Sequence, residues 1–201
     1  SGNVIKCQEA TMYGIRANGG ARAKYTNNSF IGTDGNVKVC IYVRLVHHVL
    51  IDSNSFNIKA TDQAINTDST KYIHIFNNYI RGGGTHGIRL YECEDFMVAN
   101  NEIVESSVGI WYRNSVNGSM NNNTFGDLNN SVTTAIETAN TSSAKLNYAN
   151  NNVFVGVTTR YKDTSFGSLL IVCDDKQKDF IDATLNTRKT MVIDNGAISI
   201  S

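Results

Sequence analysis

The sequence predicts an all-β solenoid, a parallel β-helix of about six coils. Two repeated motifs and one alternation of residue type predict it. An asparagine followed two positions later by Phe or Ile recurs along the chain, and so does a small residue followed directly by Ile. Apolar residues between these motifs alternate with other residues, as in Val49-x-Ile51 and Ile73-x-Ile75, which is the period of a strand with one buried face.

The asparagine motif sets the length of a coil. Successive copies are 25, 26, 24, 23, 22 and 29 residues apart, which is the range of repeat lengths found in solenoids. Asparagine tolerates the left-handed backbone of a tight corner, and its amide can donate and accept hydrogen bonds along a stack. We therefore expect the motif asparagines to lie above one another at one corner. They are Asn3, Asn28, Asn54, Asn78, Asn101, Asn123 and Asn152.

The small residue and the Ile after it mark a strand in each coil. The motif asparagine follows this Ile by 13 residues in five copies and by 16 in the sixth. A constant offset within a varying period predicts a rigid half of each coil, with loops of changing length between each asparagine motif and the next pair. The absence of Pro fits internal strands, which cannot lose a ladder donor. The pairs are Gly14-Ile15, Cys40-Ile41, Ala64-Ile65, Gly87-Ile88, Gly109-Ile110 and Ala135-Ile136.

Residues after each Ile alternate outward and inward, so they predict two outward columns rich in aromatic residues and arginine. Aromatic rings stack on sugar rings, and guanidinium groups hold hydroxyls or carboxylates. We predict a saccharide-binding face, with an acidic polysaccharide as the favoured ligand. The alternative is that the arginines stack on the rings only to cover a solvated sheet. The predicted binding residues are Tyr42, Arg44, Arg89, Tyr91, Trp111, Arg113 and Glu137.

Acidic residues near this face are the candidates for catalysis. A glycoside hydrolase needs two carboxyl groups about 5 to 5.5 Å or 6.5 to 9.5 Å apart. Asp68 with Glu92 or Asp95 of the next coil can meet this requirement, whereas Glu137 lies three coils from Asp68, roughly 14 Å away. The alternative is that these acids are solvated corner residues. The sequence leaves open whether the protein is an enzyme.

Residues 3–156, with their small-Ile strands, apolar alternation and asparagine ladder, resemble the right-handed parallel β-helix of pectate-lyase-like proteins, most of all bacteriophage tailspike shafts. The resemblance implies a homotrimer in the virion tail that binds, and in the catalytic case depolymerises, a bacterial surface polysaccharide. Two alternatives stay open: a secreted or extracellular lyase or glycoside hydrolase, and a non-catalytic shaft. In a lyase, Arg89 or Arg113 beside Asp68 would be the base.

Composition argues against other classes of partner. Lys and Arg together number 18, as do Asp and Glu, so the net charge is zero and no nucleic-acid partner is expected. No apolar run is long enough for membrane insertion. The four cysteines have no Cys-x-x-Cys spacing, so we expect structural thiols and neither a metal site nor a cofactor.

Two regions are expected: a β-helix over residues 1–156 and a β-rich capping or assembly segment over 157–201. In the second, 168–173 is typical of a strand, 174–179 of a charged loop, and Asn195-Gly196 of a hairpin turn. The chain starts on an asparagine motif with no half-coil before it. That start predicts a piece of a longer protein, with a short terminal cap as the alternative.

The strand that follows the small-Ile strand in each coil also has an outward-facing column, and this column bears on whether subunits associate. Leu50 and Met97 are apolar residues expected to face outward there, which is weak support for a subunit contact. The other members are compatible with solvent exposure. The predicted column is Lys24, Leu50, His74, Met97, Ser119 and Lys145.

Overall fold

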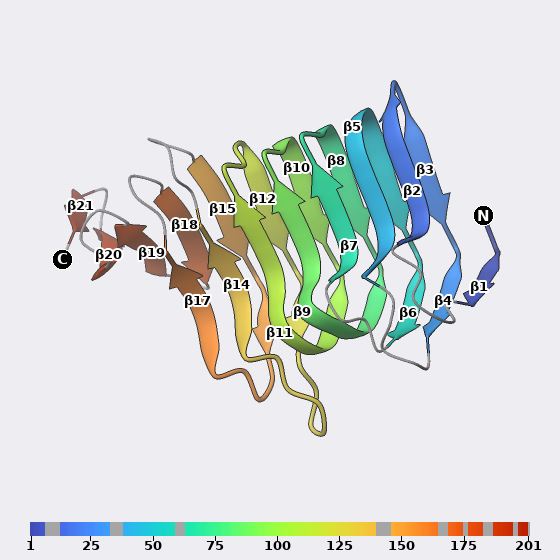
Figure 1. Ribbon diagram of the computed structural model, residues 1–201. Coiled ribbons are helices and arrows are strands. Elements are labelled where there is room, and N and C mark those ends of the chain that lie inside the picture. Colours follow the sequence, from blue (N-terminus) through green and yellow to red (C-terminus); the bar gives the residue numbers. More distant parts are fainter. Residues whose placement is uncertain are drawn as a thin grey trace.

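The computed structural model describes residues 1–6, 13–32, 38–58, 63–139, 146–164, 169–174, 177–182, 187–194 and 197–200. Their regular elements are all strands, stacked as successive coils between the two termini (Figure 1). The predicted all-β fold, a parallel β-helix of about six coils, is confirmed. In the described part of the chain, no helix is long and apolar enough to cross a membrane.

Three ladders of parallel strands run along the coils. The first ladder comprises β2 (Tyr13–Gly20), the first part of β5 (Val39–Asp52), β7 (Gln63–Asp68), the last parts of β9 (Tyr79–Tyr91) and β11 (Glu102–Arg113), β14 (Thr134–Thr138) and β17 (Thr159–Asp163). The second ladder comprises β3 (Ala23–Thr26), the last part of β5, β8 (Lys71–Phe76), β10 (Glu94–Ala99), β12 (Gly118–Asn121), β15 (Leu146–Asn150) and β18 (Leu169–Asp174). The third ladder comprises β1 (Val4–Lys6), β4 (Ser29–Gly32), β6 (Ser55–Ile58), the first parts of β9 and β11, β13 (Thr124–Phe125) and β16 (Val153–Phe154).

Packing inside the coils explains why a small residue precedes each Ile. A Cβ atom at Gly87 would lie 2.6 Å from Cγ2 of Ile103, and one at Gly109 would lie 2.5 Å from Cδ1 of Phe125. Ile103 and Phe125 belong to the third ladder and are fully buried. They occupy the space that a larger side chain would need, so the first ladder can approach them closely only where the residue before its Ile is small.

The predicted asparagine ladder is present from Asn3 to Asn152. In a typical step, the backbone N–H and side-chain Nδ2 of Asn78 donate to Oδ1 of Asn101 over 3.0 and 2.9 Å. Nδ2 of Asn78 is also within hydrogen-bond distance of the carbonyl oxygens of Ile51 and Phe76. Each amide therefore links neighbouring coils and satisfies buried backbone groups at the corner.

The ladder asparagines do not themselves adopt the left-handed conformation, so the predicted reason for their recurrence is wrong in that part. The residue before each one does: φ is 73° at Gly2, 55° at Asn27, 55° at Ser53, 53° at Asn77, 56° at Asn100, 55° at Asn122 and 52° at Asn151. The chain reverses one residue earlier than expected. The ladder positions require asparagine for its amide group, because the backbone strain lies on the preceding residue.

Coil length varies mostly where the sequence predicts, at the corner between the third ladder and the next first ladder. There the chain is divided into separate strands, β4 and β5, β6 and β7, β13 and β14, and β16 and β17, whereas β9 and β11 run through that corner unbroken. The coil made of β14, β15 and β16 differs, because its longer interval falls between β14 and β15.

This longer interval changes the outward column of the second ladder. The register pairs Ser119 with Tyr148, so Tyr148 takes the place that the sequence spacing gave to Lys145, which lies outside the described residues. Met97 and Tyr148 are 40% and 42% exposed, so two large side chains of this face contact solvent. The observed column is Lys24, Leu50, His74, Met97, Ser119 and Tyr148.

Parallel pairing continues past residue 156, because β17 pairs with β14 and β18 with β15. β19 (Gln177–Asp182), β20 (Thr187–Asp194) and β21 (Ala197–Ile200) then follow as antiparallel neighbours. The charged stretch 174–179 is therefore not all loop, since β19 begins within it. β20 and β21 pair on either side of Asn195-Gly196, which lies outside the described residues. The division of the chain at residue 156 stays a prediction.

Candidate functional site

Two outward columns of the first ladder form what we call the arginine–aromatic face. The strand register places in these columns the residues that lie one and three positions after the motif Ile residues, as the alternation predicts. The first column is Arg16, Tyr42, Asn66, Arg89, Trp111, Glu137 and Lys162. The second column is Asn18, Arg44, Asp68, Tyr91 and Arg113. All seven predicted saccharide-binding residues thus lie on one face of the β-helix.

The N-terminal end of this face contains an aromatic pair that sequence reasoning missed. The rings of Tyr13 and Tyr42 have centroids 5.0 Å apart, and Arg16 Cζ lies 5.2 and 5.9 Å from them. Tyr13 stands two residues before Ile15. Alternation alone could not assign it to the surface, because Val39 and Gln63, which share its column, are buried.

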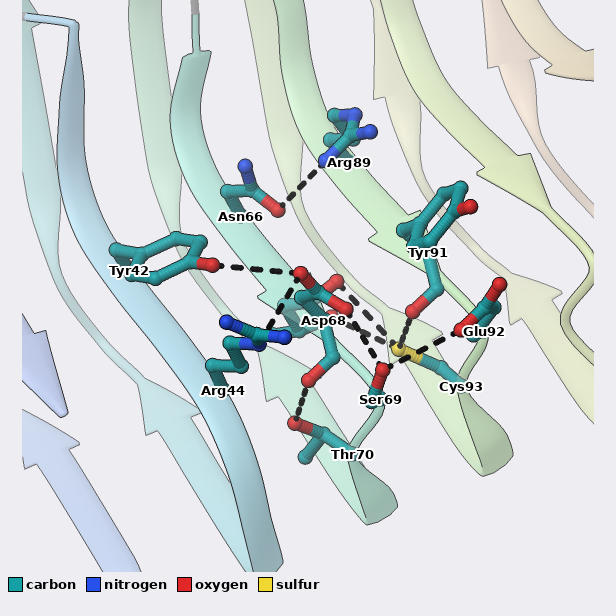
Figure 2. Close-up of polar contacts among 11 residues, drawn as sticks. Tyr42, Arg44, Asn66, Asp68, Ser69, Thr70, Arg89, Tyr91, Glu92 and Cys93 are labelled. Atoms are coloured by element: carbon teal, nitrogen blue, oxygen red, sulfur yellow. Dashed lines mark hydrogen bonds and ion pairs between the residues drawn. The ribbon is translucent and has the colours of Figure 1, made fainter. Parts of the chain in front are cut away.

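Asp68 lies at the centre of a polar cluster (Figure 2). Tyr42 and Arg44 of β5 reach across to it: the Tyr42 hydroxyl donates to Oδ2 over 3.3 Å, and Arg44 Nε lies 3.7 Å from the same oxygen. The Ser69 hydroxyl donates to Oδ1 over 2.8 Å. Burial and the neighbouring carboxylate of Asp68 raise the pKa of the Tyr42 hydroxyl above its usual value. Tyr42 therefore stays protonated at neutral pH and available as the donor.

The structure brings Asp68 and Glu92 together, and a hydroxyl group lies between them. Ser69 Oγ is 2.8 Å from Asp68 Oδ1 and 3.4 Å from Glu92 Oε2 (Figure 2). Asp95 lies elsewhere: it is on β10 of the second ladder, where Asn117 Nδ2 donates to it over 3.2 Å. Of the two predicted acid pairs, only Asp68 with Glu92 is joined through a shared contact in the described part of the chain.

Four half-buried side chains form the C-terminal part of the face. Arg89 Cζ lies 5.0 Å from the Trp111 ring centroid and 5.1 Å from that of Tyr91. Arg113 Cζ lies 5.8 Å from the Tyr91 centroid. Arg89 Nη1 also donates to Asn66 Oδ1 over 3.2 Å. These are cation–π distances, and they hold two guanidinium groups and two rings in one continuous surface.

Two further residues lie at the margins of this cluster. His86 was not predicted, and its ring centroid is 5.3 Å from that of Trp111. Glu137, the last predicted binding residue, accepts a 3.2 Å contact from Lys162 Nζ, and its own side chain is only 14% exposed. Glu137 is therefore held by an ion pair at the end of the face.

Cysteine and histidine do not form a metal centre in the part of the chain that the structure describes, where no three His, Cys, Asp or Glu side chains gather suitably. Cys40 and Cys93 are both buried. Burial raises the pKa of the Cys93 thiol to about 11, so it is protonated at neutral pH. Cys7 lies outside the described residues.

Comparison with known proteins returns one family. A family model described as a right handed beta helix region matches residues 6–173. Neither a curated protein nor a solved structure gives a significant match. The matched residues include nearly all of the parallel ladders. Such a fold is compatible with polysaccharide binding and with structural roles.

Proposed function

The chain belongs to the right-handed β-helix family, and on that premise we propose that its arginine–aromatic face binds an extended polysaccharide. The observation that carries the proposal is the in-register cluster of Arg89, Tyr91, Trp111 and Arg113. Adjacent coils are about 4.8 Å apart, so a sugar chain along the helix axis would meet one ring and one guanidinium group on each of the two coils that this cluster covers. Rings contact sugar faces, and guanidinium groups bind sugar oxygens.

Substitutions that remove an aromatic ring or a positive charge from this cluster test the proposal. We expect Trp111→Ala and Arg89→Ala to weaken retention of the protein on bacterial capsule and lipopolysaccharide preparations by about 10-fold or more. Tyr79→Ala and Arg81→Ala are the matched controls, because they lie on the third-ladder part of β9. Circular dichroism checks that all four variants stay folded. Unchanged retention after both cluster substitutions would place the site elsewhere.

The biological setting that we propose is a tailspike-like receptor-binding protein of a virion tail, with a bacterial surface polysaccharide as its partner and a homotrimer as its assembly. Support comes from the second ladder, where the large side chains of Met97 and Tyr148 are exposed on a face separate from the arginine–aromatic face. A secreted polysaccharide-processing protein is the alternative setting. Solution mass separates the two, as described in the Discussion.

A second candidate function, cleavage of the bound polysaccharide, is favoured by the contact that joins Asp68 and Glu92 through Ser69. In glycoside hydrolysis one carboxyl group protonates the leaving oxygen, while the other acts as nucleophile or activates water. We expect Asp68→Asn and Glu92→Gln each to abolish release of reducing ends. Glu102→Gln, an exposed substitution on the third ladder, is the control.

The products of the same assay distinguish the reaction types. Hydrolysis adds one water per bond cleaved, whereas a lyase releases unsaturated sugars without taking up water. Full turnover by Asp68→Asn would remove this acid from the mechanism. Binding with no products at all would leave the polysaccharide-binding proposal standing and remove the catalytic one.

A further inference from the structure

We propose that Arg89 and Arg113 form a subsite for an oxyanion carried by the bound glycan, in the first place the carboxylate of an acidic sugar. The inference rests on the proposed function and names the substrate class of the same face. Both guanidinium groups lie close to the ring of Tyr91, with Cζ at 5.1 and 5.8 Å from its centroid. Two like charges on one ring repel each other unless an anion lies near both.

Protein carboxylates do not supply that anion. The ion pairs of the described residues are Arg44–Asp68, Lys71–Glu94, Arg81–Glu105 and Lys162–Glu137. Neither Arg89 nor Arg113 takes part in any of them. The acids that share their two columns are already engaged, Asp68 by Arg44 and Glu137 by Lys162, and Glu92 contacts Ser69. The only polar partner of the Arg89 guanidinium among these residues is the neutral amide of Asn66.

A second observation points to a missing acceptor. Arg113 Nε is buried, and no hydrogen-bond acceptor lies within reach of it in the part of the chain that the structure describes. A buried donor without a partner is costly, and a charged donor more so. Both side chains are half-buried, and partial burial weakens the screening of their charges by solvent and salt. The site therefore has both charge and donor capacity that the protein leaves unused.

The chemistry of the pair selects the ligand. A guanidinium group presents a planar fork of N–H donors that matches the two oxygens of a carboxylate. Hydroxyls of a neutral sugar could accept the same hydrogen bonds but would leave the two charges uncompensated. Trp111 and Tyr91 lie beside the pair, so a sugar ring stacked there would present its acidic substituent to both arginines.

Nuclear magnetic resonance of arginine Nε–H groups tests the subsite with small probes. We expect sodium glucuronate to shift the Arg89 and Arg113 signals saturably, while glucose at the same concentration leaves them unchanged. The Arg81 signal is the internal control, because Glu105 already pairs with that guanidinium in two contacts. Equal shifts with glucose, or no shift with glucuronate, would overturn the inference. Equal saturation by inorganic phosphate would overturn a sugar as the source of the anion.

Binding of the whole polysaccharide provides an independent test of the subsite. Arg89→Gln and Arg113→Gln should each weaken binding of an acidic capsular polysaccharide by about 10-fold, and Arg81→Gln, with the same charge change, should not. Chemical reduction of the polymer's carboxyl groups should cost a similar factor with the unaltered protein. If the reduced polymer binds equally well and Trp111→Ala still abolishes binding, the proposed function stands and the anion subsite is wrong.

Discussion

At the scale of single residues, the asparagine ladder couples the sequence repeat to the stability of the stack. Asn101 illustrates this. Its Nδ2 contacts the carbonyl oxygens of Ile75 and Ala99, and its Oδ1 accepts from the backbone and side chain of Asn78. Its side chain is buried, so no water can replace these hydrogen bonds when the amide is removed.

We therefore expect Asn101→Ala to lower the free energy of unfolding by roughly 3 kcal/mol or more, since each buried polar group left without a partner costs about 1 to 3 kcal/mol. Urea denaturation measures this. Asn57→Ala, an exposed asparagine in β6, is the control and should change stability by less than about 0.5 kcal/mol. Equal effects of the two substitutions would contradict the conclusion that the asparagine ladder stabilises the fold.

Cys93 gives a prediction about pH. Its thiol pKa is raised from 9.0 to about 11 by burial, so the folded protein keeps this proton after the unfolded chain has lost it. The Cys93 thiol therefore contributes roughly 3 kcal/mol to the free energy of unfolding below pH 9, and this contribution is lost as the pH rises from 9 to 11. In Cys93→Ala this part of the decline should vanish. Stability that falls equally steeply in both proteins between pH 9 and 10 would contradict the assignment.

Two tyrosines contribute to the same alkaline decline without obscuring it. Burial is the main cause of a raised hydroxyl pKa at both Tyr25 and Tyr42. Their stabilising contributions therefore start to fall only above pH 10, and they do so in the unaltered protein and in Cys93→Ala alike. Urea denaturation at pH 8, 9 and 10 isolates the thiol.

At the scale of elements, adjacent strands fit together through small residues placed opposite large ones. Gly118 of β12 shows the closest fit, because a Cβ there would lie 1.8 Å from Cζ of the buried Phe96 in β10. We expect Gly118→Ala to lower the free energy of unfolding by about 1 to 3 kcal/mol, since Phe96 or the strand must move. Urea denaturation measures the change, with Ser119→Ala as the neighbouring outward control. A neutral Gly118→Ala would mean that Phe96 has room to move.

Elements also show where sequence reasoning succeeded and where it could not. The columns through Tyr42, Arg89 and Trp111 follow from alternation and a constant offset, and the register confirms their order. The place of Tyr148 could not be found this way, because the interval before β15 is longer than in the preceding coils. A repeat predicts register only as far as its spacing stays constant.

At the scale of the whole molecule, the proposed assembly predicts a mass. Light scattering should give about three times the 22.1 kDa of the chain. Met97→Lys should shift the protein towards monomer, because it places a charge on the second-ladder face that we expect to be covered. Val153→Lys is the control, since Val153 is an exposed apolar residue of the third ladder. A monomer at all concentrations would contradict the homotrimer.

The sequence by itself determined the coil, the ladder asparagines and the membership of the two outward columns, because a repeat fixes which residues become neighbours one coil apart. Only the tertiary structure decided what those neighbours do to each other. The left-handed residue precedes Asn78 and is not Asn78 itself, Ser69 joins Asp68 to Glu92, and Arg113 Nε has no hydrogen-bond partner among the described residues. Such features depend on the geometry of the corners and on side-chain rotamers, and these can shift atoms by ångströms while the number of residues per coil stays the same.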